Sequence, residues 1–599
     1  MDTLNRICRF LFGWLRGRDG VMALATFLSL MWFVVDWCLL TTFRSMSDWM
    51  LYAVNILAAL LLMAPWMLSR RVWLQTAFLA LVDILLEANL MYCRTYFTAI
   101  PPDSYLLAGN MADFTSSITD SLRPADAGFL IVLAACAVWA YRSRSQEASR
   151  RTLRWLALTA VATATATAGF VARGGFYKAY DKLIQNCYYF TCGVPTYTVA
   201  GHVAYYTIEN HRNSRLSEAD REELRAWFGE HAKAAVAPDT VAARRSLVLI
   251  ICESLESWPI GAEVDGKPVT PYLNSLVADY TTFYAPKVLT QVCAGHSIDG
   301  QLMYTTGLLP TAGFVYSMKY PHNAYPSLNK ILKADRGARS TMLTTDKLFT
   351  WNQGAVAEAF GYDSIISYDG WRRDELIDRK VSDGSFFRQS VEKLSKGDIW
   401  PVGEPAMLTF ITISGHNPFA LTDELADPGF DASRIDIPET IARYVNVTHY
   451  VDSQLHTLID YIYSRPDADG ILTVIVGDHE GLGLERDRAR RWSAEGAALV
   501  GKEKFVPMIV LNAPAPGRYD GVMGQVDVFP TVLDMLGLRH SPWRGLGASV
   551  LGEGKVPAAY TLVPVELFGD TAGVAPSALE HLRRAPAVSE RIIVHDLLK

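Results

Sequence analysis

Residues 246–254 read Ser-Leu-Val-Leu-Ile-Ile-Cys-Glu-Ser, an apolar run that ends in a carboxylate. A second apolar run, Ile-Leu-Thr-Val-Ile-Val at 471–476, is followed by Gly-Asp-His-Glu, so Asp478 and His479 stand at the end of another predicted strand. Unbroken hydrophobic runs are typical of buried parallel strands, and open α/β sheets bind ligands at the carboxyl ends of their strands. We therefore expect Glu253, Asp478 and His479 to meet in one cleft.

The predicted cleft has the donors of a divalent cation site. Two carboxylates and one imidazole provide oxygen and nitrogen ligands, which suit Mn²⁺, Zn²⁺ or Mg²⁺. A glutamate at a strand end is by itself more often a surface or capping group. Burying Asp478 and His479 without a partner or a metal is unfavourable, so the pair carries more weight.

Strand-like and helix-like runs alternate after residue 245, which predicts an α/β domain with a mostly parallel central sheet. Residues 541–599 are harder to assign and could form a small C-terminal subdomain. The predicted strands are 247–252, 340–345, 407–413, 471–476 and 506–512, and the predicted helices are 271–279, 325–333, 355–360, 438–462 and 528–536.

The first 172 residues carry five apolar stretches. Each is near the length that crosses about 30 Å of hydrocarbon at 1.5 Å per residue. Because further apolar segments follow the first, a single cleavable signal peptide does not explain the pattern. The predicted spans are 21–43, 50–68, 72–92, 127–141 and 155–171.

Arginines indicate the orientation of these spans. They are concentrated before the first span, between the second and third, and between the fourth and fifth, whereas the other short connections hold few. Under the positive-inside rule the N-terminus is cytoplasmic, and five spans leave the rest of the chain in the periplasm or outside the cell. Within the spans, Asp83 and Glu87 share a helical face and, with Asp36, either pair internally or guide a lipid headgroup.

Composition separates a membrane part from a soluble part. Half of the 599 residues are hydrophobic and the net charge is −6, yet the chain after residue 245 has the mixed charge of a soluble domain. No dense basic stripe occurs there, so we expect no nucleic-acid partner. Cys187 and Cys192 are close enough for a local disulfide, although the sequence does not decide whether it forms.

A connector lies between the two parts. Residues 176–206 are rich in aromatic side chains, which favour the membrane interface. Residues 216–235 are predicted to form a charged helix, with Ser217 as N-cap and Asp220 completing a capping box. We therefore divide the chain into a five-span membrane domain at 1–172, a connector with interfacial and charged helices at 173–244, and a soluble extracytoplasmic domain at 245–599.

A metal alone does not define a reaction, and a transfer reaction also requires a nucleophile. Residues 294–301 read Ala-Gly-His-Ser-Ile-Asp-Gly-Gln, which fits a turn leading into a helix that begins near Ser297. Helix N-termini favour anions, and a serine hydroxyl becomes a nucleophile when a base or a metal removes its proton. A serine in such a turn is usually only a turn residue, so Ser297 gains weight only together with the metal ligands.

The order of these motifs resembles the lipoteichoic acid synthase family of the alkaline phosphatase and sulfatase superfamily, over nearly the whole chain. The motifs are the membrane spans, Glu253, Gly-His-Ser-Ile-Asp-Gly-Gln at 295–301, Trp351-Asn352, Gly-His-Asn-Pro-Phe at 415–419, and Gly-Asp-His at 477–479.

The resemblance implies a membrane-anchored phosphoglycerol transferase. Such enzymes move glycerol phosphate from phosphatidylglycerol onto an acceptor hydroxyl outside the membrane, here on a glycan or glycolipid, and usually use Mn²⁺, with Zn²⁺ or Mg²⁺ as alternatives. The implied metal ligands are Glu253, Ser297, Asp478 and His479, the implied nucleophile is Ser297, and the implied substrate contacts are His416, Trp351 and Asn352.

Two positions depart from the family pattern. Ser297 stands where those synthases have threonine, which preserves the hydroxyl. Gln353 stands where an arginine is expected to hold the phosphate, so the headgroup is open. Because the family includes Gram-negative members that make no lipoteichoic acid, polymer synthesis does not follow.

Other functions remain open at this point. A phosphoethanolamine transferase or a phosphodiesterase of the same superfamily would share the architecture and metal. A sulfatase needs a Cys/Ser-x-Pro-x-Arg motif, but Cys293 is followed by Ala-Gly-His-Ser. A catalytically inactive scaffold that binds polysaccharide would leave the metal ligands without a role. His416 could merely cap a loop, and Trp351 could be ordinary core.

Overall fold

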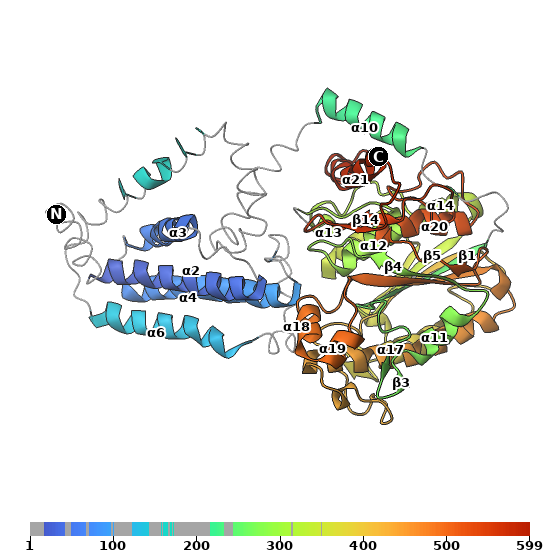
Figure 1. Ribbon diagram of the computed structural model, residues 1–599, viewed down its shortest axis with the longest axis horizontal. Helices are drawn as coiled ribbons and strands as arrows, with labels where there is room; N and C mark the ends of the chain where they lie inside the picture. Colours follow the sequence, from blue (N-terminus) through green and yellow to red (C-terminus); the bar gives the residue numbers. More distant parts are fainter. Residues whose placement is uncertain are drawn as a thin grey trace. The chain divides into compact units, whose positions relative to one another are not determined.

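The computed structural model describes residues 17–41, 49–67, 71–96, 100, 122–142, short helical pieces between 157 and 172, 216–232, 236, 244–312, 315–348 and 350–599. These residues form two compact units, one with helices α2 to α6 and the other with the elements from α10 onward (Figure 1). Cys187 and Cys192 lie outside the described residues. The predicted domain boundaries stay a prediction.

The first unit is helical. Its described helices are α2 (Arg18–Thr41), α3 (Trp49–Met67), α4 (Val72–Tyr96) and α6 (Ala127–Arg142), the last preceded by the short helix η3 (Pro124–Asp126). The windows Arg18–Val35, Val72–Met91 and Pro124–Arg142 are long and apolar enough to cross a membrane. The count of five is not confirmed, because among the described residues only these three windows qualify, and the predicted spans 50–68 and 155–171 are not among them. Asp83 in α4 is 5 % exposed, and the side chain of Asp36 is not described.

A nine-stranded sheet, counted within the described residues, is the centre of the second unit. Its order is β12-β4-β11-β10-β1-β9-β5-β6, and β13 also pairs with β4. The pairs of β1 with β10 and β9, and of β5 with β9 and β6, are parallel. The sequence therefore predicted the mostly parallel α/β class correctly. The main strands are β1 (Ser246–Cys252), β4 (Phe283–Leu289), β5 (Arg339–Thr344), β6 (Ser364–Ile366), β9 (Ala406–Ile411), β10 (Ile471–Gly477) and β11 (Phe505–Leu511).

The strands β1 and β10 lie side by side. Every residue of β1 and β10 is buried, as their unbroken apolar composition predicts. The register pairs Ser246 with Ile471 and Cys252 with Gly477. Because the register is parallel, the next residue of each strand, Glu253 and Asp478, emerges at the same edge of the sheet.

One strand, β11, runs against its neighbours in the sheet. β11 is antiparallel to β10 and to β4, and β4 was not predicted. The sequence of β4, Phe-Tyr-Ala-Pro-Lys-Val-Leu, is interrupted by Pro286 and exposed Lys287, and the register with β11 shifts between Val506 and Met508. Proline lacks the N–H that a regular ladder requires, so the apolar pattern of this strand is broken.

Helices cover both faces of the sheet. Alternate residues of β1 divide between the faces: Leu247, Leu249 and Ile251 belong to one core, and Val248 and Ile250 to the other. In Figure 1, α12, α14, α20 and α21 lie above the sheet, and α11 and α17 lie below it. These helices are α11 (Pro271–Ala278), α12 (Ser297–Thr306), α14 (Leu328–Arg336), α16 (Asp383–Leu394), α17 (Glu439–Ser464), α20 (Val528–Met535) and α21 (Pro576–His595).

Smaller elements complete the unit. The helices are α13 (Tyr316–Lys319), α15 (Gln353–Phe360), α18 (Glu485–Trp492) and α19 (Ala494–Leu499), and the short strands are β2 (Glu263–Val264), β3 (Lys267–Pro268), β7 (Leu376–Ile377), β8 (Lys380–Val381), β12 (Gly517–Arg518), β13 (Met523–Gly524), β14 (Ala558–Tyr560) and β15 (Leu567–Gly569).

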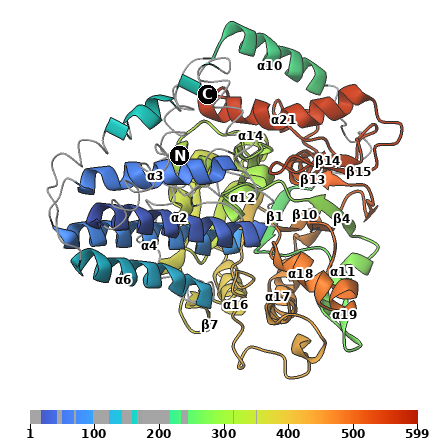
Figure 2. The ribbon, with the colours of Figure 1, turned by 60° about the vertical axis from the view of Figure 1, so that its left-hand side comes forward.

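The charged helix of the connector is confirmed as α10 (Glu218–His231). The Asp220 amide donates to Ser217 Oγ over 3.1 Å, and the Ser217 amide donates to the Asp220 carboxylate over 3.1 Å, so the predicted capping box forms. Both ribbon views show α10 beside α21 (Figures 1 and 2). Trp227 stacks on both His231 and His581, with ring centroids 4.6 and 4.4 Å from those of the two imidazoles, and these contacts join α10 to α21.

Candidate metal and phosphoryl-transfer site

Three predicted ligands meet at the carboxyl ends of β1 and β10. Ligand atoms of Glu253, Asp478 and His479 all lie within 4.8 Å of one another. His479 Nε2 is 3.3 Å from Glu253 Oε1 and 3.6 Å from Asp478 Oδ2. The three residues are 7, 1 and 7 % exposed, so this concentration of charge is shielded from bulk water.

Backbone groups orient two of the ligands. Asp478 Oδ1 accepts the amide protons of Ser254, over 2.7 Å, and of His479, over 2.8 Å. The Glu480 carbonyl lies 2.8 Å from His479 Nδ1 and accepts its proton, which directs Nε2 toward the two carboxylates. A histidine ligand held through its second nitrogen in this way is typical of metal sites.

Ser297, the predicted nucleophile, joins this group. It is the first residue of α12, and its Oγ lies 3.0 Å from Glu253 Oε2 and 3.3 Å from His479 Nε2. The Asp299 carboxylate accepts the amide protons of Cys293 and Gly295, over 2.8 and 3.0 Å. These hydrogen bonds fix the turn that precedes α12. A Cβ at Gly295 would lie 2.3 Å from Asp299 Oδ1, which explains the glycine at this position.

The backbone is strained on both sides of the site. Ser254, next to Glu253, has a φ of 57°, and His296, next to Ser297, has a φ of 45°. Such conformations cost about 1–3 kcal/mol in residues other than glycine and are frequent at functional sites. The surrounding structure therefore holds Glu253 and Ser297 in place at the cost of unfavourable backbone conformations beside them.

Charge is unevenly distributed among the buried groups. Burial and the neighbouring charge of Glu253 raise the pKa of Asp478. Burial acts to raise the pKa of Glu253 as well, but the hydrogen bond and charge of His479 outweigh it and lower that pKa. Burial lowers the pKa of His479, yet Asp478 and Glu253 together raise it to about 10. The imidazole of His479 is therefore the positive partner of the two carboxyl groups in this arrangement.

This donor set fits a divalent cation. It combines two buried carboxylates with an imidazole whose Nε2 is aimed at them, and a hydroxyl within hydrogen-bond distance of both ligand types. Mixed oxygen and nitrogen donors of this kind suit Mn²⁺, Zn²⁺ and Mg²⁺ without selecting among them.

A supporting ion pair beside the site was not predicted from the sequence. Glu480 Oε1 is 2.9 Å from Lys504 Nζ, and Lys504, acting against burial, lowers the pKa of Glu480 to about 2. The His296 ring lies 5.1 Å from the His479 ring, between centroids. Glu480 follows Asp478 and His479 directly and could have been found by extending that motif. Lys504 carries no signal in the sequence, because only the antiparallel course of β11 brings it there.

His416 stands on the loop after β9, near the site. Asp383 Oδ1 accepts the amides of Ile413 and Ser414, over 2.9 and 3.2 Å, and so holds the start of this loop. His416 Nδ1 is hydrogen-bonded to the Asn417 carbonyl. Burial and Lys380 lower the pKa of His416, and the charge of Glu253 opposes them, so the imidazole is close enough to sense that carboxylate.

Trp351 and Asn352 lie on a separate loop segment. Both have a φ of 52°, and Asn352 Nδ2 donates to the Ser317 carbonyl over 3.1 Å. Within the described chain, no hydrogen bond joins either residue to Glu253, Ser297, Asp478 or His479. Gln353 Nε2 donates to Gln301 Oε1 of α12 over 3.2 Å. The residue that replaces the expected arginine therefore makes a buried side-chain hydrogen bond.

Comparison with known proteins identifies the domain. Residues 245–538 match the Sulfatase family model. Lipoteichoic acid synthase 2 from Bacillus subtilis is 24 % identical over 505 residues, which cover 79 % of this chain and 73 % of that protein. Lipoteichoic acid synthase from Staphylococcus aureus is 27 % identical over 366 residues, covering 58 % of this chain and 54 % of that protein.

Solved structures share the fold. The lipoteichoic acid synthase LtaP from Listeria monocytogenes has a TM-score of 0.53 at 17 % identity and covers 61 % of this chain and 97 % of its own. The integral membrane lipooligosaccharide phosphoethanolamine transferase A from Neisseria meningitidis has a TM-score of 0.52 at 15 % identity and covers 87 % of this chain and 96 % of its own. With the four converging side chains, these matches lead to one assignment: residues 245–538 form a sulfatase-family domain of the alkaline phosphatase superfamily, and the chain is an enzyme related to the lipoteichoic acid synthases.

Proposed function

We propose that this enzyme transfers a phospholipid headgroup phosphate, glycerol phosphate from phosphatidylglycerol, through a phosphoserine on Ser297 to a hydroxyl of a glycan or glycolipid. The observation that carries the proposal is the position of Ser297 Oγ, 3.0 Å from Glu253 Oε2 and 3.3 Å from His479 Nε2. The sequence relationship to two lipoteichoic acid synthases supports the donor class.

In the first half of the reaction, Ser297 Oγ attacks the headgroup phosphorus in line with the bond to diacylglycerol. The Ser297 O–H bond breaks and the bond from Ser297 Oγ to phosphorus forms, while the bond to the diacylglycerol oxygen breaks and diacylglycerol leaves with the proton that Ser297 gives up. Glu253, Asp478, His479 and Ser297 would hold one divalent cation, Mn²⁺ by resemblance, which when bound supplies a lower hydroxyl pKa and neutralises phosphoryl charge. The N-terminus of α12 favours negative charge beside Ser297.

In the second half, the acceptor hydroxyl attacks the phosphoserine. The new phosphorus–oxygen bond forms, the bond to Ser297 Oγ breaks, and the acceptor proton moves to His416, from which it returns to Ser297 Oγ. Because burial lowers the pKa of His416, its imidazole is neutral at pH 7 and can accept that proton. Trp351 and Asn352 would contact the headgroup from their own loop.

A phosphoethanolamine donor is the second candidate. Gln353 is uncharged, and its side chain is hydrogen-bonded to Gln301. Position 353 therefore offers no cation for a glycerol phosphate. The two donors differ only in the headgroup that would remain on Ser297, and a labelled headgroup therefore distinguishes them.

The test uses full-length enzyme with phosphatidylglycerol or phosphatidylethanolamine, each radiolabelled in its headgroup. We expect label from phosphatidylglycerol on Ser297 in the native enzyme and at least about 1,000-fold less in Ser297→Ala, because the nucleophile is lost. Ser395→Ala, at an exposed serine after α16, is the matched control and should label normally. Undiminished transfer by Ser297→Ala would contradict the mechanism, and label only from phosphatidylethanolamine would reassign the donor.

We further propose that the protein is a multi-pass protein of a bacterial inner membrane, with a cytoplasmic N-terminus and a periplasmic or extracellular catalytic domain. The apolar helices of the first unit and the arginine distribution support this orientation. Protease added outside intact spheroplasts should cleave residues after 245. Protection there until the membrane is opened would reverse the orientation.

A further inference from the structure

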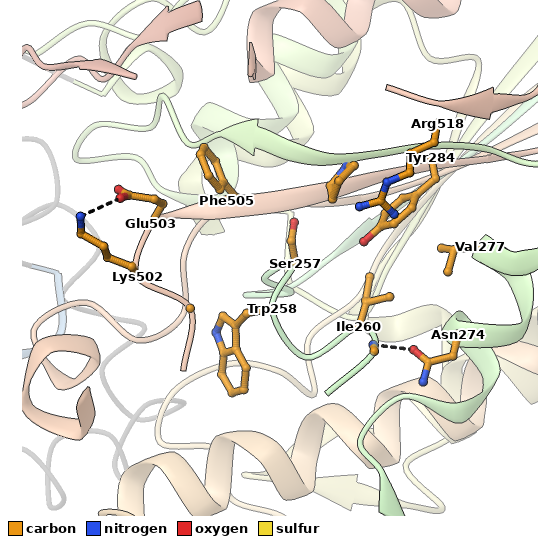
Figure 3. A pocket seen from close by; sticks show the side chains of 13 residues that line it. Ser257, Trp258, Ile260, Asn274, Val277, Tyr284, Lys502, Glu503, Phe505 and Arg518 are labelled. Carbon is orange, nitrogen blue, oxygen red and sulfur yellow. Dashed lines mark hydrogen bonds and ion pairs between the residues drawn. The ribbon is translucent and has the colours of Figure 1, made fainter. Parts of the chain in front are cut away.

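The second unit contains a cavity that the metal site does not use. Its volume is about 590 Å³, and it is bounded by the segment after β1, by α11 and by β4, β11 and β12 (Figure 3). We propose that this cavity is the acceptor subsite and binds a neutral saccharide ring, an inference that rests on the proposed function. A volume of this size holds one to two sugar rings within the ordinary range of ligand pockets.

Two residues with hydroxyl groups, Ser257 and Tyr284, line the cavity. Ser257 lines it, is 9 % exposed, and its Oγ has no hydrogen-bond partner in the described part of the chain. Leaving a buried hydroxyl unsatisfied is unfavourable by roughly 1–3 kcal/mol, so a ligand that bonds to it is favoured. Figure 3 shows Ser257, the Tyr284 hydroxyl and the Arg518 guanidinium directed toward one region of the cavity. Hydroxyl and guanidinium groups of this kind bond to the several hydroxyls of a sugar.

The remaining walls are apolar and flat. Trp258, Tyr284 and Phe505 contribute aromatic surface. The C–H face of a sugar ring packs against such surfaces while its hydroxyls bond to the polar groups at the edges. This combination of aromatic walls and a few convergent polar groups distinguishes a saccharide site from a purely apolar one.

The charges of the lining favour a neutral ligand over an anion. Arg518 Nε is 2.8 Å from Asp520 Oδ1, and the guanidinium lies 5.1 Å from the centroid of the Tyr284 ring. Lys502 Nζ is 3.6 Å from Glu503 Oε1. Because each cation already has a carboxylate close to it, the cavity presents little net positive charge to a phosphate.

Two segments connect the cavity to the residues around Ser297. Ser257 is four residues after Glu253, a separation that an extended chain spans in at most about 14 Å. The Ser257 amide donates to the Phe505 carbonyl over 2.9 Å. Glu503 and Phe505 line the cavity, while Lys504 between them pairs with Glu480 beside His479. An oligosaccharide seated here can therefore extend a hydroxyl toward Ser297.

A glycan array tests the proposal directly. Full-length protein in detergent is applied to an array of neutral oligosaccharides, glycerol-phosphate-substituted oligosaccharides and acidic oligosaccharides. We expect retention on neutral members, weakened about five- to ten-fold in Tyr284→Phe and in Ser257→Ala, since each loses one hydroxyl. Tyr280→Phe is the matched control, because Tyr280 is 89 % exposed, and it should bind as the native protein does.

Absence of retention on the neutral oligosaccharides would overturn the inference, and so would retention confined to the charged ones. Unchanged retention of Tyr284→Phe and Ser257→Ala would also overturn it, provided that both variants unfold at the same temperature as the native protein. Ser297→Ala separates this proposal from the proposed function. Its retention should equal that of the native enzyme, since binding in the cavity does not need the nucleophile. If phosphoserine forms but the array does not retain the protein, only the proposed subsite is refuted. If the array retains the protein but no phosphoserine forms, the cavity binds a saccharide without serving as the acceptor subsite.

Discussion

At the residue scale, the proposed function depends on four side chains from three distant segments. Glu253 ends β1, Asp478 and His479 end β10, and Ser297 begins α12. Each has an ordinary explanation when considered alone, as a capping, turn or core residue. In the folded protein these side chains converge, with hydrogen-bond distances among them, and burial leaves like charges adjacent. Because such burial is unfavourable without a compensating partner, we infer that the four residues share one chemical role.

The metal proposal leads to a prediction at Asp478. Adding Mn²⁺ at about 100 times its Kd should stabilise the native enzyme by about 2.7 kcal/mol, because the ion binds only the folded state. Asp478→Asn keeps the shape but removes one charged ligand, so its melting temperature should not respond to Mn²⁺. Thermal unfolding of the full-length protein, with and without chelator, measures both.

Asp469→Asn supplies the control for this measurement. Asp469 is an exposed carboxylate close to the start of β10, far along the strand from Asp478. Its variant should respond to Mn²⁺ as the native enzyme does. An equal Mn²⁺ response in Asp478→Asn would remove this residue from the metal site.

At the element scale, α12 must approach the end of β10 closely to deliver Ser297. A Cβ at Gly300 would lie 2.8 Å from the Asp478 carbonyl oxygen and 3.2 Å from its Cα. Neither backbone atom can move without moving Asp478, a proposed metal ligand. The glycine in the first turns of this helix is therefore a condition for the site's geometry.

Two glycine-to-alanine changes in helices should have opposite effects. Gly300→Ala should lower the free energy of unfolding by about 1–3 kcal/mol through overpacking, and should reduce phosphoserine formation because α12 is displaced. Gly229→Ala in α10 should raise the free energy of unfolding by about 0.5–1 kcal/mol, since nothing lies within 4 Å of its Cβ. Thermal unfolding and labelling of both variants decide the matter, and native labelling of Gly300→Ala would refute the close-approach argument.

At the scale of the whole catalytic unit, α10 is attached to α21 through a stack of histidine and tryptophan rings. His231 Nε2 donates to the Gly545 carbonyl over 2.9 Å, and His231 Nδ1 lies 3.3 Å from His581 Nε2. Burial and His581 lower the pKa of His231 to about 4, with Arg544 acting in the same direction and Asp527 opposing it. A charged imidazole is therefore disfavoured while α10 is docked.

Docking of α10 should weaken in acid. The docked state binds fewer protons than the undocked state between pH 6.5 and about 4, so its stability falls as the pH drops through that interval. At pH 5 the loss should be about 1–2 kcal/mol. Hydrogen exchange of residues 218–231 in the full-length protein, corrected for intrinsic rates, should therefore accelerate from pH 7.5 to pH 5.

His231→Phe tests the assignment of this effect. The variant keeps a ring on Trp227 but cannot titrate, so the acid-induced acceleration should shrink to the part contributed by His581. An unaltered dependence on pH in His231→Phe would show that another group controls docking.

Local sequence alone determined much of this protein. The apolar runs of β1 and β10, the residues that end them, the N-cap of α10 and the Gly-His-Ser turn depend on neighbours within a few positions, and so they could be read directly. The mostly parallel α/β class followed from the alternation of such runs. The substrate roles given to Trp351, Asn352 and His416 came from family resemblance and stay predictions.

Only the tertiary structure decided which distant groups meet. The antiparallel course of β11 brings Lys504 to Glu480, and the interrupted strand β4 completes the cavity beside Ser257. The docking of α10 on α21 joins residues about 350 positions apart. Sequence patterns report burial and local propensity, whereas strand direction, register and helix packing are set by the combined burial of many surfaces, and no short stretch of the chain encodes them.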